Sequence, residues 1–132
     1  MKITLHTTQK LERFVCSNSK DQAIVLGNGN AVSPMEGLLM SLAGCSTIDM
    51  IMILKKMRQK IKDIKVEVKG KRKDDNPRTF TKIKLCFTII GEVKSKKAQE
   101  ALDLSLEKYC SVAKSLDPAI KVSGSFKIVK AK

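Results

Sequence analysis

The sequence predicts an α+β fold in which a long apolar helix is covered by β-sheet. Two observations carry this prediction. A single apolar stretch over residues 37–54 follows a helix start, and short alternating patterns typical of strands lie on both sides of it. A chain of 132 residues suffices for one domain, because a domain of this size buries about two thirds of the surface that its unfolded form exposes. We therefore expect one domain over residues 1–132.

The first 30 residues predict three short strands. Ile3 and Leu5 alternate with polar residues, and the mixed runs 13–16 and 23–26 follow. The segment 27–30, with the sequence Gly-Asn-Gly-Asn, then ends the last strand.

A long helix begins after Ser33. Ser33 suits the cap, Pro34 suits the first helical position, and Glu36 suits the return bond of a capping box. The helix extends to about residue 59, and residues 37–54 are apolar on nearly every face. Because one small sheet covers only one side of such a helix, we expect two copies to pack together in an intertwined homodimer.

The apolar stretch is just long enough for a membrane span of about 18 residues. Asp49 lies well inside it, and several hydroxyl groups make it more polar than a helix that faces lipid. The N-terminus has no continuous apolar segment and no small-residue cleavage site. We therefore expect a cytoplasmic protein with no membrane partner.

The second half predicts strands around another helix. Residues 64–68 and 81–89 alternate between apolar and polar side chains, and a charged segment connects them. Apolar residues recur at helical spacing over 98–109, and a last alternating strand, interrupted by Gly124, occupies 120–128. We expect an antiparallel sheet.

The formal net charge of +13 arises from 26 Lys and Arg against 13 Asp and Glu. Clustered basic residues favour nucleic-acid binding, because they release counterions from phosphates. However, only four of these residues are arginine, and the four Phe and one Tyr are not interleaved with the charge as stacking platforms would be. We expect lysine-rich faces that keep the protein soluble, and no specific nucleic-acid partner.

The chain has four cysteines, Cys16, Cys45, Cys86 and Cys110. Without an export signal they are expected to be reduced thiols. No pair has Cys-x-x-Cys spacing and His6 is the only histidine, so a structural zinc site is poorly supplied with ligands. We expect no metal and no cofactor, and we assign Cys16 and Cys86, which lie in strand patterns, to structure.

The residues around Cys45 and Cys110 favour reactive thiols. Cys45 follows Gly44 inside the apolar helix, where a glycine costs about 1 kcal/mol relative to alanine and so indicates a close approach of backbone, partner or ligand. Cys110 precedes a short predicted helix over residues 111–116, and a helix N-terminus lowers the pKa of a thiol. The structural alternatives are a small buried hydrophobic residue at the first position and an ordinary junction cysteine at the second.

Asp49 lies one turn after Cys45 on the same helix face. An ionised carboxylate there would raise the pKa of a nearby thiol. A buried carboxylate also needs a partner, which we expect a neighbouring element to supply.

Two segments resemble known motifs of the OsmC/Ohr superfamily. Residues 33–49, with the sequence SPMEGLLMSLAGCSTID, are similar to its signature, especially that of the YhfA-like branch, and residues 109–112, Tyr-Cys-Ser-Val, resemble its second cysteine motif. The resemblance covers essentially the whole chain. It implies an α+β intertwined homodimer, in which a long buried central helix is wrapped by antiparallel sheet and two active sites lie at the subunit interface.

The resemblance also implies an antioxidant activity of the stress-response type, a thiol peroxidase. The first cysteine of such proteins, here Cys45, attacks an organic hydroperoxide and becomes a sulfenic acid. The second, here Cys110, converts it to a disulfide, which an external dithiol then reduces.

Glu36 and Arg13 complete the set of catalytic residues that the resemblance implies. In the Ohr motif a Glu directly follows the Pro and partners a catalytic arginine. Here Met35 intervenes, which moves Glu36 about 100° around the helix. Arg13 is assigned by position, as the one arginine before the helix.

Two other classes of function remain open at this point. A non-enzymatic protein could bind a small hydrophobic ligand in the pocket around Cys45, although such a carrier would not require Cys110. A nucleic-acid-binding module would show an affinity that falls steeply with salt.

Overall fold

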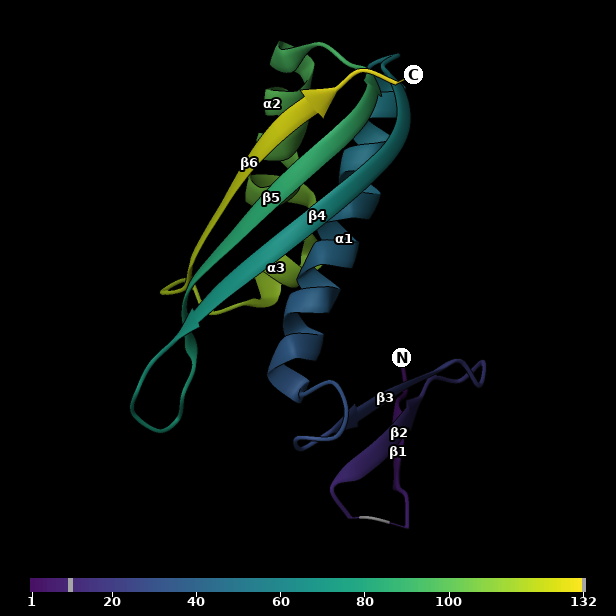
Figure 1. Ribbon diagram of the computed structural model, residues 1–132, viewed down its shortest axis with the longest axis vertical. Helices are drawn as coiled ribbons and strands as arrows, with labels where there is room; N and C mark the ends of the chain where they lie inside the picture. The colour runs from purple at the N-terminus through teal and green to yellow at the C-terminus, as the bar shows by residue number, and fades with distance from the viewer. Residues whose placement is uncertain (10, 132) are drawn as a thin grey trace. The chain divides into compact units, whose positions relative to one another are not determined.

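The computed structural model describes residues 1–9 and 11–131 and confirms the α+β class. Its residues form two compact units, Met1–Leu39 and Met40–Lys132, and helix α1 (Pro34–Lys56) runs from the first into the second. Each unit contains a three-stranded sheet (Figure 1).

The first unit holds the three predicted N-terminal strands. They are β1 (Thr4–Thr7), β2 (Arg13–Ser17) and β3 (Ala23–Gly27). Both pairings are antiparallel, with β2 in the centre.

Helix α1 begins with the predicted capping box. The backbone N–H of Ser33 donates to Glu36 Oε1 at 2.9 Å, and the backbone N–H of Glu36 donates to Ser33 Oγ at 3.1 Å. The helix ends at Lys56, three residues before the predicted end, because Arg58 adopts a left-handed conformation with φ of 60°. The N–H of residue 59 then donates to the carbonyl of Leu54 at 2.9 Å, which closes the last turn.

The sheet of the second unit consists of β4 (Lys60–Arg72), β5 (Phe80–Glu92) and β6 (Lys121–Val129). Side chains of β5 alternate between buried and accessible positions, as expected for a sheet with one covered face. In Figure 1, helices α1 and α2 (Ser95–Leu104) lie on the same face of this sheet. The core between them includes Leu42, Met50, Leu54, Ile83, Leu85, Phe87, Ile89, Ala98, Ala101 and Leu102.

One pairing in this sheet differs from the prediction. Strand β4 is antiparallel to β5, but β6 is parallel to β5, so the sheet is mixed. A parallel neighbour requires a crossover connection of about a dozen residues or more. The chain supplies it with α2, a π-helical turn η1 (Ser105–Tyr109) and the short helix α3 (Ser111–Ser115).

Gly124 does not interrupt β6, although the sequence pattern predicted an interruption. A Cβ atom at this position would lie 2.9 Å from Leu102 Cδ1 and 2.8 Å from Leu106 Cδ1. The glycine therefore lets the crossover helices approach the strand closely.

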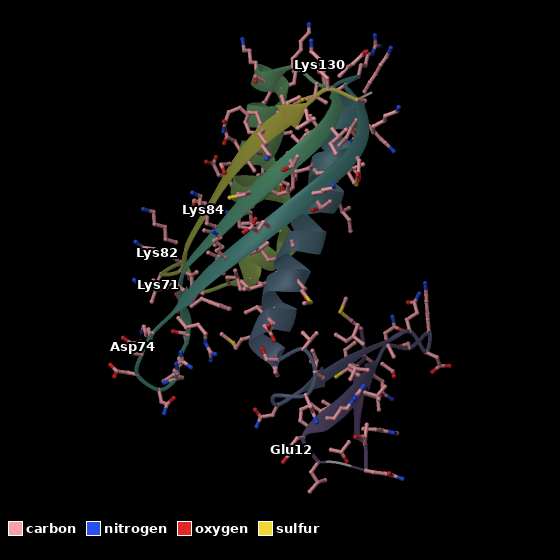
Figure 2. All side chains as sticks on the ribbon, in the orientation of Figure 1. Glu12, Lys71, Asp74, Lys82, Lys84 and Lys130 are labelled. Carbon is pink, nitrogen blue, oxygen red and sulfur yellow. The ribbon has the colours of Figure 1, made fainter. Side chains whose placement is uncertain are left out.

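The outer face of the second sheet is rich in lysine. Lys71, Lys82 and Lys121 are neighbours across the three strands, and Lys69 pairs with Lys84. Figure 2 shows Lys71, Lys82 and Lys84 at the same end of the sheet. The predicted lysine-rich face is confirmed as a structural feature.

Candidate functional site

Cys45, Asp49 and Cys110 lie together in the second unit. One ligand-type atom from each, the two thiol sulfurs and a carboxylate oxygen, lies within 4.8 Å of the other two. Cys45 and Cys110 are far apart in the sequence, so the fold brings together the two cysteines that the sequence singled out.

Helix α1 supplies Cys45 and Asp49 from successive turns of one face. Both side chains are half-buried, whereas Leu42 and Ser46, on neighbouring positions, are fully buried. Cys45 is accessible to solvent on one side and lies close to Cys110 on the other. A small molecule can therefore reach its thiol. Gly44 is exposed, and a Cβ atom there would have no neighbour within 4 Å among the described residues of this chain.

Cys110 occupies the junction between the π-helical turn and α3. Its backbone N–H donates to the carbonyl of Ser105 at 2.7 Å, and its sulfur caps α3 by accepting from the N–H of Ala113 at 3.5 Å. The predicted helix start after Cys110 is confirmed. The side chain is fully buried.

Burial raises the pKa of the Cys110 thiol, and neighbouring Cys45 and Asp49 raise it further, while the Ala113 N–H lowers it. The helix start after Cys110 predicted a lowered pKa for its thiol, and this prediction was wrong. Desolvation of a buried thiolate outweighs the single N–H group that this short helix offers.

Asp49 has the partner that a half-buried carboxylate needs. Ser105 Oγ lies 3.5 Å from Asp49 Oδ2 and 3.3 Å from the carbonyl oxygen of Ser46, so its one proton is shared between them. Burial raises the pKa of Asp49, and the hydrogen bond from Ser105 opposes the shift. Sequence reasoning missed Ser105, because nothing in the residues around it marks a π-helical turn.

Glu36 and Arg13 belong to the first unit. Glu36 is exposed and engaged in the capping box, and this hydrogen bonding to Ser33 lowers its pKa. Arg13 is exposed at the start of β2, opposite Gly27 of β3. That Glu36 and Arg13 assist catalysis by Cys45 stays a prediction.

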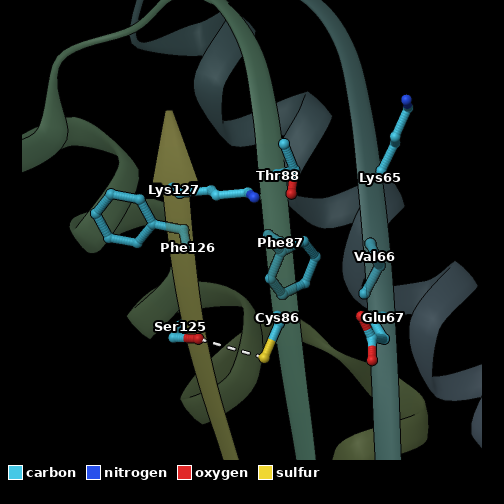
Figure 3. Close-up of a pocket in the computed structure, with 9 residues that line it drawn as sticks. All are labelled: Lys65, Val66, Glu67, Cys86, Phe87, Thr88, Ser125, Phe126 and Lys127. Carbon is cyan, nitrogen blue, oxygen red and sulfur yellow. Dashed lines mark hydrogen bonds between the residues drawn. The ribbon is translucent and has the colours of Figure 1, made fainter. Parts of the chain in front are cut away.

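Cys16 and Cys86 lie in strands, as the sequence indicated. Cys86 is in the middle of β5 on the outer face of the sheet, where Ser125 Oγ donates to its sulfur at 3.5 Å (Figure 3). It lines a hollow of about 450 Å³ together with residues such as Glu67 and Lys127. Neither cysteine belongs to the group around Cys45.

A second hollow, of about 430 Å³, adjoins Asp49. Its other lining residues come from the end of α1 and from the crossover helices: Met52, Ile53, Lys56, Met57, Leu104 and Tyr109. The site therefore has an apolar surface beside it, with one lysine at its edge.

The chain is similar to known proteins in both sequence and fold. A family model described as OsmC-like protein matches residues 27–124. Protein YhfA of Escherichia coli K12 is 42% identical over 118 residues, which cover 87% of this chain and 88% of YhfA.

Two solved structures show the extent of the similarity. A hypothetical protein from Aquifex aeolicus VF5 is 34% identical and has a TM-score of 0.91, with 99% of this chain and 97% of that chain covered. The organic hydroperoxide resistance protein OhrB of Bacillus subtilis has a TM-score of 0.68 at 17% identity, with 96% of each chain covered. At that identity the likeness shows the fold alone.

Proposed function

Because the chain belongs to the OsmC-like protein family, we propose that it is a cysteine-based thiol peroxidase that reduces organic hydroperoxides. The observation that carries the proposal is the approach of the Cys45 and Cys110 thiols, which lie within 4.8 Å of each other beside Asp49. Organic hydroperoxides are the substrate class that the motifs around Cys45 and Cys110 imply, and OhrB, an organic hydroperoxide resistance protein, shares this fold.

The proposed reaction has two steps in the protein. The Cys45 thiolate attacks the terminal oxygen of ROOH, so that an S–O bond forms, the O–O bond breaks, and RO⁻ leaves and takes up a proton as ROH. The resulting sulfenic acid then reacts with the Cys110 thiol, which forms the disulfide and releases water. An external dithiol reduces the disulfide and restores both thiols.

Burial supports this order of roles. Cys45 is half-buried and accessible, whereas Cys110 has no exposed surface. A hydroperoxide therefore reaches Cys45 first. Cys110 is close enough to Cys45 for a disulfide after a small movement, which suits a resolving residue.

Glu36 and Arg13 are proposed to assist Cys45. The family motif, in which an acidic residue near the helix start partners an arginine, supports this role. The extra Met35 changes the face on which Glu36 lies.

We further propose an intertwined homodimer whose subunits each contribute residues 1–132 as one OsmC-like domain. The family model, which matches residues 27–124, runs from the end of the first compact unit into the second, which supports a single domain. On α1, Met40, Ile48 and Met52 are 58%, 61% and 54% exposed. These side chains and Gly44 recur at intervals of four, so they form one apolar stripe that a second copy of the helix would cover.

The proposed location is the cytoplasm. Helix α1 is long and apolar enough to cross a membrane by length and composition. It also carries Asp49 and buries Leu42, Met50 and Leu54, and in an OsmC-like fold such a helix belongs to the core. A membrane location is therefore not indicated.

The experiment is disulfide mapping after one equivalent of an organic hydroperoxide. Reduced wild-type protein should form an intramolecular disulfide between Cys45 and Cys110, identified by peptide mass spectrometry. Cys45→Ser should consume no hydroperoxide, and Cys110→Ser should consume one equivalent and stop at a trappable sulfenic acid. The controls Cys16→Ser and Cys86→Ser should react like wild type. Wild-type consumption by Cys45→Ser would refute the proposal.

The hollow beside Asp49 favours one alternative, a carrier of a small hydrophobic ligand. Its apolar lining and volume of about 430 Å³ are within the range of small-molecule sites. A carrier would retain its ligand in Cys45→Ser and Cys110→Ser alike, so the same variants separate the two functions.

A further inference from the structure

The group formed by Cys45, Asp49 and Cys110 has the composition of a transition-metal site. Cys45 and Asp49 are four residues apart on α1, the spacing at which side chains of one helix face hold a single ion. Cys110 reaches them from the crossover connection. Two sulfurs and one carboxylate oxygen thus converge from two separate elements.

The spacing of these atoms suits an ion of the size of zinc. Around a tetrahedral ion, two ligands that each lie about 2.3 Å from it are about 3.8 Å apart. The three atoms lie within 4.8 Å of one another, so a closing movement of about 1 Å brings all three into contact with one ion. Three protein ligands leave a fourth position for water, as in catalytic zinc sites.

The ligand types select among cations. Calcium and magnesium prefer sites made only of oxygen, whereas thiolates with a carboxylate suit zinc, which also leaves thiols in their reduced state because it has no redox chemistry.

Two neighbouring residues support the ligands from behind. The Ser105 hydroxyl lies 3.5 Å from Asp49 Oδ2 and so helps to orient the carboxylate. The N–H of Ala113 points at Cys110 Sγ at 3.5 Å. Groups that orient ligands in this way are the usual outer shell of a metal site.

We propose that Cys45, Asp49 and Cys110 form a zinc site, and that bound zinc blocks the reaction of the two thiols with hydroperoxide. Zinc binding itself does not depend on the proposed function, but the competition with hydroperoxide rests on it. The sequence predicted no metal, because it has no Cys-x-x-Cys spacing and a single histidine. The three residues of this group converge only in the fold.

Zinc binding is tested on reduced protein, without oxygen or hydroperoxide, by competition with a chromophoric chelator. We expect one zinc per chain. Titration with Co²⁺ should give thiolate-to-cobalt charge-transfer absorption. Asp49→Asn should weaken zinc binding by at least about tenfold, since even outer-shell partners are worth about 10- to 100-fold, and Cys45→Ser or Cys110→Ser should weaken it further.

Two controls separate this site from adventitious binding. Asp103→Asn changes an exposed aspartate of α2, and Cys86→Ser removes a thiol outside the group; both should bind zinc like wild type. Alkylation of wild-type protein should be slowed by zinc at Cys45, which is accessible, and unchanged at Cys16, a measurement that needs no variant to fold. Unchanged affinity in Asp49→Asn and Cys110→Ser, or no selective protection, would overturn the site.

The competition is tested separately by hydroperoxide consumption with and without one equivalent of zinc. We expect at least a tenfold slower reaction in zinc, restored by chelator. Equal rates with zinc bound would overturn the blocking role. If Cys45→Ser consumed hydroperoxide normally, the proposed peroxidase function would fail, while the binding and alkylation results would still decide the zinc site.

Discussion

Ser105 Oγ lies 3.3 Å from the backbone carbonyl oxygen of Ser46 and donates a hydrogen bond to it, although the two residues are 59 positions apart. Both residues are fully buried. The bond joins the π-helical turn before Cys110 to the turn of α1 that carries Cys45. It therefore fixes the approach of the two candidate thiols.

Replacing Ser105 with alanine should loosen this connection. We expect the free energy of unfolding to fall by about 1–3 kcal/mol, because the Ser46 carbonyl and the Asp49 carboxylate both lose the hydrogen bond from the Ser105 hydroxyl. Disulfide formation between Cys45 and Cys110 should also slow. Urea denaturation and quenched-flow alkylation measure the two effects, and exposed Ser123→Ala is the control. Equal disulfide rates in Ser105→Ala and wild type would contradict the role of this bond.

The capping box should give α1 a pH-dependent stability. Hydrogen bonding to Ser33 lowers the folded-state pKa of Glu36 from 4.5. Its contribution is therefore fully present above the pKa of the unfolded chain and is lost as the pH falls through the folded-state pKa. The difference in unfolding free energy between wild type and Glu36→Gln should be constant near neutral pH and shrink below about pH 4.5. Urea titrations across this range test it; a difference that grew on acidification would contradict it.

Gly124→Ala should destabilise the crossover. The added methyl group would approach Leu102 and Leu106 to 2.9 and 2.8 Å, and overpacking of this kind costs about 1–3 kcal/mol. Thermal unfolding measures the loss. Gly124→Ala combined with Leu106→Ala should recover part of it by making room, and no recovery would show that the contact is not the cause.

Gly44→Leu distinguishes a monomer from a dimer. In an isolated chain the substitution should stabilise α1, since among the described residues no atom outside the adjacent helix backbone lies within 4 Å of the added Cβ, and glycine costs about 1 kcal/mol in a helix. In the proposed dimer it should separate the two helices and reduce the mass measured by light scattering at micromolar concentration. A well-folded wild-type monomer would refute the dimer directly.

The lysine-rich face should bind nucleic acid only through charge. At about 0.15 M salt we expect dissociation constants on the order of 10⁻⁴ to 10⁻⁶ M without sequence preference. Lys82→Glu combined with Lys84→Glu should weaken this binding, whereas Lys96→Glu, on α2, should weaken it less. Gel-shift titrations at several salt concentrations decide the point, and tight sequence-selective retention would reverse the expectation.

Local patterns were sufficient to predict most of the elements. The capping residues located the start of α1, and alternation located β4 and β5, because both signals depend on neighbours in the sequence. The parallel pairing of β6 was not predictable in this way. It depends on the path of the crossover, and an alternating strand looks the same in either direction.

The candidate site was predictable only in part. The motifs marked Cys45 and Cys110, but local pattern could not show that Cys110 is buried, and its pKa is therefore raised where the helix start alone suggested the reverse. The role of Ser105 depends on a π-helical turn and on a hydrogen bond to Ser46, 59 positions away, and neither is visible in a local pattern.

The crossover between β5 and β6 also sets the time at which the two thiols meet during synthesis. Cys45 leaves the ribosome 65 residues before Cys110, and Cys110 is held in place only when the crossover helices dock and β6 pairs with β5. Non-local parallel pairing is a slow, late event in folding. The two thiols therefore come within 4.8 Å of each other only late in folding, after the chain has been synthesised past both of them.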